Sequence, residues 1–77
     1  TFVINYSLLE KTFVSISVFD VLGRKVIDLA SFNKSKGVHQ IAWNGRDSSN
    51  KPSAPGVYFV KVKAGKNQIN KKIVLLK

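Results

Sequence analysis

Alternation of apolar and polar residues at period two recurs along this chain, and no long stretch follows the period of a helix. In Phe2–Leu8 every second side chain is a large apolar or aromatic group. In residues 14–18 two serines separate three β-branched residues. This spacing is typical of strands with one buried face, so the sequence predicts an all-β fold.

Turn residues separate the predicted strands. Asp20 can bond the backbone of a turn, and Gly23 can take the left-handed conformation of a type I turn with a bulge. They predict a hairpin into a strand at residues 25–29. A polar stretch over residues 31–37 follows, and then a fourth strand carries His39 and Trp43 on one face. Trp43 is the expected core anchor.

The C-terminal part predicts a loop and a hairpin. Residues 44–56 are rich in proline, glycine, serine and asparagine, and they predict a long ordered loop, with or without a short edge strand. Two further strands are expected at residues 57–63 and 68–76, and a turn at Gly65 and Lys66 would pair Lys63 with Gln68. The pattern indicates a Greek-key β-sandwich of about seven short antiparallel strands.

The size and composition fit a single excised domain. A chain of 77 residues leaves room for one core, and the absence of methionine indicates a piece of a larger protein. Cysteine is also absent, so packing and strand pairing must hold the fold. No apolar run approaches the ~20 residues of a membrane-spanning helix, so no membrane span is expected.

The charge is strongly positive and uneven. Thirteen Lys and Arg face four acids, for a formal net charge of +9, and no acid follows Ser48. Such a charge attracts polyanions. Lysines spread along strands also keep a small β-domain soluble and protect its edges. That explanation is favoured over specific binding of nucleic acid.

Catalytic groups are few. One histidine, four isolated acids and no cysteine predict a non-enzymatic domain without cofactor or metal. His39 is expected to pack on an apolar face, and Asn44, Asp47 and Asn50 are better explained as turn caps than as calcium ligands. Because alternation places Tyr58 and Phe59 on opposite faces, a sugar-binding aromatic platform that includes Trp43 is not favoured.

Four segments together resemble one known family, over nearly the whole chain and in the family's order. They are residues 16–26 (ISVFDVLGRKV), 43–47 (WNGRD), 55–59 (PGVYF) and 71–77 (KKIVLLK). The pattern is similar to the type A C-terminal sorting domain of the type IX secretion system. Within it, Asp20, Gly23, Trp43, Gly56 and Tyr58 are expected to have structural roles. The family's asparagine-proline motif before the first strand is missing here.

The resemblance implies an immunoglobulin-like β-sandwich that directs an N-terminal cargo domain through the outer-membrane translocon of a Gram-negative bacterium of the Bacteroidetes. It implies passage through the periplasm to the cell surface or medium, and a surface sortase-like peptidase as a second partner. The same pattern also resembles the immunoglobulin-like domain of flagellar hook-capping proteins. The alternative function is therefore a structural or carbohydrate-associated accessory module without a sorting role.

The last hairpin provides the candidate recognition surface. In the register set by Gly65 and Lys66, one face is apolar except for Lys71, and the other face is both apolar and basic. An exposed apolar patch rimmed by lysines is typical of a docking site. A covering loop or a slipped register would instead bury this face. The candidate translocon-recognition residues are Val57, Phe59, Lys61, Lys63, Lys72, Val74, Leu76 and Lys77.

Overall fold

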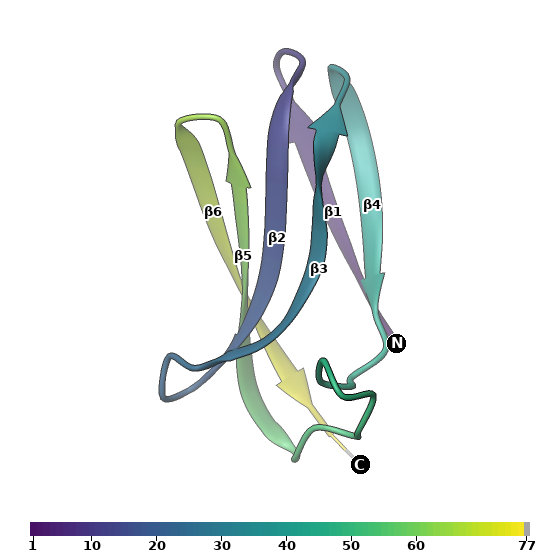
Figure 1. The fold of residues 1–77 in the computed structure, drawn as a ribbon, viewed down its shortest axis with the longest axis vertical. Coiled ribbons are helices and arrows are strands. Elements are labelled where there is room, and N and C mark those ends of the chain that lie inside the picture. The colour runs from purple at the N-terminus through teal and green to yellow at the C-terminus, as the bar shows by residue number, and fades with distance from the viewer. Residues whose placement is uncertain (77) are drawn as a thin grey trace.

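The computed structural model describes residues 1–76, which form six strands in two layers (Figure 1). The strands are β1 (Phe2–Leu8), β2 (Thr12–Asp20), β3 (Lys25–Lys34), β4 (Gly37–Trp43), β5 (Gly56–Ala64) and β6 (Asn67–Leu75). One sheet has the order β3-β2-β5-β6, and the other consists of β1 and β4 alone. All pairings are antiparallel. The predicted all-β, immunoglobulin-like sandwich is confirmed.

The described residues contain six strands, so the expected number of about seven is corrected. The loop over residues 44–56 contains one isolated bridge, between Arg46 and Pro52, and no further strand. Proline cannot donate to a strand ladder, and the two prolines here limit pairing to that bridge. The two sheets have unequal widths, with four strands in one and two in the other.

The strand β3 is longer than the sequence predicted. The polar stretch expected at residues 31–37 is wrong for its first part, because Ser31 to Lys34 continue β3, and Ser35 and Lys36 connect it to β4. Phe32 explains the extension, since it pairs with Val14 and packs against the core while Ser31 and Asn33 face solvent. Two register shifts between β2 and β3 lie in the first half of β3, so the inward-facing set of that half does not continue in step to Phe32.

The predicted register of the last hairpin is confirmed. Lys63 pairs with Gln68, and the turn consists of Gly65 and Lys66. Gly65 has a φ of +60°, and its N–H donates to the Phe13 carbonyl at 3.2 Å. A Cβ at this position would lie 2.8 Å from Thr12 Oγ1, so glycine allows the turn to pack directly on the start of β2.

The core lies between the two sheets. Its buried residues come from β1, β2, β4 and β5, and β3 and β6 add partly buried side chains. Trp43 is 1% exposed, which confirms it as the core anchor. Its ring centroid lies 5.4 Å from that of Tyr58 in an edge-to-face arrangement and 5.9 Å from that of Phe2. The buried apolar cluster consists of Ile4, Tyr6, Leu8, Val14, Ile16, Val18, Trp43, Tyr58, Val60 and Val62. Residues 1–76 include no helix long and apolar enough to span a membrane.

Candidate docking surface

The turn between β2 and β3 is built by Asp20 and Gly23, as the sequence predicted. Asp20 Oδ1 accepts hydrogen bonds from the N–H groups of Leu22 and Arg24, both at 2.9 Å. Its Oδ2 accepts from Arg24 Nε at 3.0 Å. Gly23 has a φ of +84°, which a residue with a side chain rarely adopts. The bond from the Arg24 N–H is the main cause that lowers the pKa of Asp20.

The long loop is ordered by short polar bonds to its own backbone. Asn44 Oδ1 accepts from the Arg46 N–H, and Asp47 Oδ1 accepts from the N–H groups of Ser49 and Lys51, at 2.9 to 3.0 Å. Trp43 Nε1 donates to the Arg46 carbonyl at 2.9 Å. The turn-capping interpretation is confirmed for Asn44 and Asp47, and the loop is fixed to the core by Trp43.

The loop leads into β5 at Gly56, which has a φ of +147°. Two residues later, the buried Tyr58 hydroxyl donates to the Ala54 carbonyl, four residues upstream. A tyrosine bonded back to the preceding backbone is a feature of immunoglobulin-like sandwiches. The Tyr58 ring therefore packs in the core, and its hydroxyl fixes the backbone just before β5 begins. This agrees with its predicted structural role.

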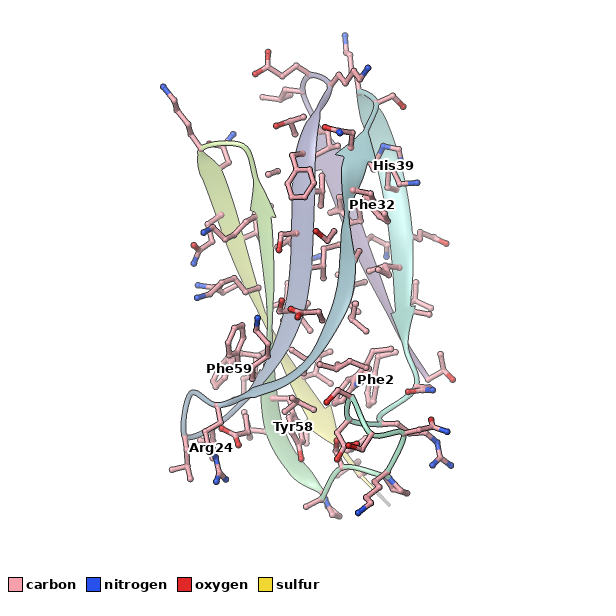
Figure 2. All side chains as sticks on the ribbon, in the orientation of Figure 1. Phe2, Arg24, Phe32, His39, Tyr58 and Phe59 are labelled. Atoms are coloured by element: carbon pink, nitrogen blue, oxygen red, sulfur yellow. The ribbon has the colours of Figure 1, made fainter. Side chains whose placement is uncertain are left out.

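Alternation along β5 produces the candidate recognition surface. Tyr58, Val60 and Val62 are buried, so Val57, Phe59, Lys61 and Lys63 point to the other side of the sheet. Figure 2 shows Tyr58 and Phe59 on opposite sides of the strand. Across the ladder, Val74 faces Val57 and Lys72 faces Phe59. We call this surface the outer face, and it consists of Val57, Phe59, Lys61, Lys63, Lys72 and Val74.

The outer face is open and partly apolar. Phe59 is 39% exposed and Val74 is 49% exposed. Leu76, which was also a candidate, lies beyond the end of β6 and is 78% exposed. Lys77, the last candidate, lies outside the described residues. The six residues of the outer face thus lie together, as predicted, in the register that the sequence indicated.

A further residue of this surface was missed by the sequence analysis. Phe19 on β2 pairs directly with Phe59, and Lys61 Nζ lies 5.0 Å from the centroid of the Phe19 ring. This distance is typical of a cation–π contact. The same alternation that buries Val18 places Phe19 outward, so the signal was present in the sequence. Phe19 joins the apolar centre of the outer face.

An acid lies at the β3 side of this surface. Asp28 accepts a hydrogen bond from Ser17 Oγ, and Lys25 Nζ lies 3.1 Å from its Oδ1. The Ser17 bond, followed by that of Lys25, lowers the pKa of Asp28. The charge of Asp28 is paired with Lys25, so it does not neutralise the lysines of β5 and β6. The outer face is therefore positively charged.

His39 does not belong to this surface. It is half-buried on β4, with its Nε2 2.8 Å from the Ser35 carbonyl and its ring 5.5 Å from that of Tyr6. It is packed, as the sequence predicted. Among residues 1–76, no three His, Asp or Glu side chains gather in a way that could hold a metal ion.

Two antiparallel sheets packed around a buried tryptophan, with a tyrosine bonded back at the entry to β5, define an immunoglobulin-like β-sandwich. A family model described as the FlgD Ig-like domain matches residues 5–68, and the chain belongs to this family. The predicted relation to the hook-capping immunoglobulin-like domain is thereby confirmed. No curated protein and no solved structure gives a significant match.

Proposed function

We propose that this domain is a non-enzymatic sorting module, which directs an N-terminal cargo domain across the outer membrane through the type IX translocon. The observation that carries this proposal is the outer face, where Phe59 and Val74 are exposed between Lys61, Lys63 and Lys72. An exposed apolar surface with a charged rim is typical of a protein-binding site. The translocon is then the partner that binds this surface.

The resemblance of the chain to type A sorting domains supports the same function. Under this proposal the cargo passes through the periplasm of a Gram-negative bacterium of the Bacteroidetes and reaches the cell surface or the medium. A surface sortase-like peptidase is the second partner, which removes the domain after export. The domain contributes no turnover chemistry of its own.

The experiment is an export assay in a type IX competent host. A reporter fused behind a signal peptide and ahead of this domain should reach the medium or the cell surface. The triple variant Phe59→Ser, Val74→Ser and Lys72→Glu should leave the reporter in the periplasm. These side chains are exposed, so the purified variant should remain folded by circular dichroism and Trp43 fluorescence.

A control variant makes similar changes, from valine to serine and from lysine to glutamate, away from the outer face. Val3 and Val38 are 58% and 77% exposed on β1 and β4, and Lys36 is an exposed lysine between β3 and β4. Val3→Ser, Val38→Ser and Lys36→Glu should leave export unchanged. Export by a folded outer-face variant would show that the translocon reads another surface. A periplasmic wild-type fusion would contradict the sorting function itself.

The second candidate is a structural immunoglobulin-like module, of the hook-cap type, with no sorting role. The family match favours it, because residues 5–68 match the FlgD Ig-like domain. A structural module needs β6 only to complete the sheet. In the export assay it predicts that the wild-type fusion stays in the periplasm in folded form.

A further inference from the structure

The two sheets of the sandwich do not cover each other completely. The sheet of β1 and β4 has two strands, and the opposite sheet has four. Within residues 1–76, the edge of β1 that faces away from β4 has no strand partner. On the opposite sheet, Ile69 belongs to the inward-facing set of β6 but is 44% exposed. The inner face of β6 is therefore only partly covered by β1.

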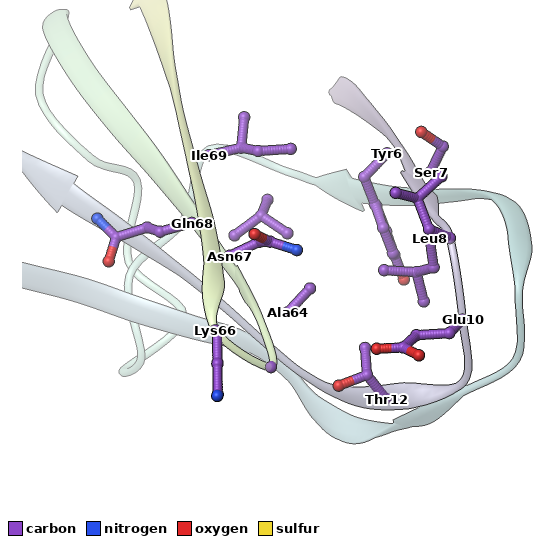
Figure 3. Close-up of a pocket in the computed structure, with 13 residues that line it drawn as sticks. Tyr6, Ser7, Leu8, Glu10, Thr12, Ala64, Lys66, Asn67, Gln68 and Ile69 are labelled. Atoms are coloured by element: carbon purple, nitrogen blue, oxygen red, sulfur yellow. The ribbon is translucent and has the colours of Figure 1, made fainter.

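A groove of about 1120 Å³ occupies this uncovered region. Figure 3 shows Tyr6 and Leu8 of β1 on one side, with Ala64 and Ile69 of the last hairpin across from them. Val62 contributes a further apolar wall. The groove runs between a free strand edge and an apolar sheet face. This is the environment that an added β-strand occupies.

Lys71 shows which backbone groups of β1 point to its free edge. Its Nζ donates to the Asn5 carbonyl at 2.7 Å, across the two sheets and over 66 residues of sequence. This carbonyl therefore points away from β4. In an antiparallel pair, residues alternate between those that bond their partner strand and those whose N–H and C=O point outward. The outward groups of β1 are thus those of Val3, Asn5 and Ser7.

An unpaired polar group also lies at the groove. Tyr6 lines it, and the Tyr6 hydroxyl is buried without a hydrogen-bond partner among the described residues. Burial raises the pKa of this hydroxyl. A buried hydroxyl without a partner costs free energy that a hydrogen bond would recover. An occupant could provide it only by displacing the side chains that cover the Tyr6 hydroxyl.

Charge indicates the kind of occupant. The titratable groups in the groove lining are Tyr6, Glu10 and Lys66, and Lys71 lies just outside the lining, where its Nζ bonds to Asn5. The domain as a whole carries a formal charge of +9. A second copy of the chain would bring another +9 into contact, which is unfavourable, whereas an acidic segment is attracted.

We propose that the groove beside β1 binds an extended acidic segment of another protein, which adds as a strand to the free edge of β1. The backbone of the segment pairs with Ser7 and with Asn5, whose carbonyl exchanges its hydrogen bond from Lys71 for one from the segment. Its apolar side chains, at every second position, pack on Leu8, Val62 and Ile69, and its acidic side chains remain accessible to Lys66 and Lys71. This site is separate from the outer face, so it does not depend on the sorting function.

The probe is a short synthetic peptide in which Glu and Val alternate, blocked at both ends and labelled for fluorescence anisotropy. Two controls have the same composition. One groups the Glu and Val residues in separate blocks, and the other carries N-methyl groups on the amides that would pair with β1. The alternating peptide should bind the 77-residue chain, and both controls should bind about tenfold more weakly or not at all.

Two neighbouring lysines provide matched variants of the protein. Lys71→Glu should weaken peptide binding about tenfold or more, because it places a like charge at the groove. Lys72→Glu makes the same change of charge on the outer face and should have little effect. Hydrogen exchange gives an independent measure, since the amides of Asn5 and Ser7 should exchange fast in the free protein and slowly in the complex.

Several results would overturn the proposal. The first is absence of binding by the alternating peptide. The second is equal binding of the alternating and block peptides, which would indicate general attraction to the positive charge. The third is an equal effect of Lys71→Glu and Lys72→Glu. The last is protection of Asn5 and Ser7 amides that increases with protein concentration without peptide, since a second copy would then occupy the groove.

Discussion

At the scale of single residues, two aspartates of this basic chain accept hydrogen bonds that favour their ionised form. Asp20 accepts three hydrogen bonds in the turn between β2 and β3, and Asp28 accepts one from Ser17 close by. In each case the hydrogen bonds favour the ionised carboxylate, and they lower the pKa of the group. Unfolding exposes these carboxylates to water and returns their pKa to the ordinary value of about 3.9.

This linkage predicts the acid sensitivity of the domain. A lowered pKa in the folded state means that the carboxylate contributes stability that is fully present above the unfolded value. That contribution is lost as the pH falls through the folded value. Asp20→Asn should therefore make the loss of stability below about pH 5 less steep. Urea unfolding at a series of pH values measures this slope.

The second acid serves as the control. Because the pKa of Asp28 is also lowered, mainly by the Ser17 hydrogen bond, the single variant should keep part of the slope. Adding Asp28→Asn should make it flatter still. If the slope of Asp20→Asn equals that of the wild type, the hydrogen bonds of the turn do not control the acid response.

At the scale of elements, the close approach of the last hairpin to β2 depends on one glycine. Gly65→Ala adds a Cβ that would lie 2.8 Å from Thr12 Oγ1, in a backbone with a φ of +60°. A residue other than glycine in this conformation costs about 1 kcal/mol, and the contact adds to that cost. We expect Gly65→Ala to destabilise the domain by about 1 to 3 kcal/mol, measured by urea unfolding.

Two further variants separate these contributions. Gly23 also has a positive φ, but a Cβ there would meet no atom within 4 Å, so Gly23→Ala should report the backbone cost alone. Thr12→Ala removes the hydroxyl, and it should recover part of the loss in the double variant with Gly65→Ala. A double variant as unstable as the sum of the single variants would exclude the Thr12 contact as a cause.

Elements with local signals could be predicted from the sequence, and those set by distant contacts could not. Gly65 and Lys66 formed a recognisable turn, and the turn fixed the register and both faces of the last hairpin. The second half of β3 looked like a loop, because Ser31 and Asn33 are polar and the register shifts before them put Phe32 out of step with the first half of the strand. The contact of Lys71 with Asn5 depends on how the two sheets stack, which no local pattern encodes.

The residues of the candidate site also divide into those with a local sequence signal and those placed by distant contacts. The residues of the outer face were predictable, since period-two alternation places Phe59 opposite to Tyr58. Phe19 was missed because its position beside Phe59 requires the pairing of β2 with β5, whose sequences are far apart. The groove was missed for a similar reason, because it results from the unequal widths of the two sheets rather than from any one segment.

At the scale of the whole molecule, the sheet order makes folding depend on contacts between distant segments. The strand β2 pairs with β5, and β1 pairs with β4 across the intervening β2–β3 hairpin. Sandwiches dominated by such contacts fold in about milliseconds to seconds, because long loops must close before the contacts form. We expect refolding in that range, observed as a change in the fluorescence of the buried Trp43 in stopped-flow experiments. Refolding within microseconds would contradict this account.

The position of the strand ends also determines how the domain would respond to pulling. β1 begins and β6 ends at the same end of the sandwich (Figure 1). The first pairs reached from there are Phe2 with Trp43 and Leu75 with Gly56. A force applied through the chain would peel β1 from β4 and β6 from β5, so that hydrogen bonds break a few at a time instead of sharing the load. We therefore expect the domain to unravel under low mechanical tension when it is pulled from both ends.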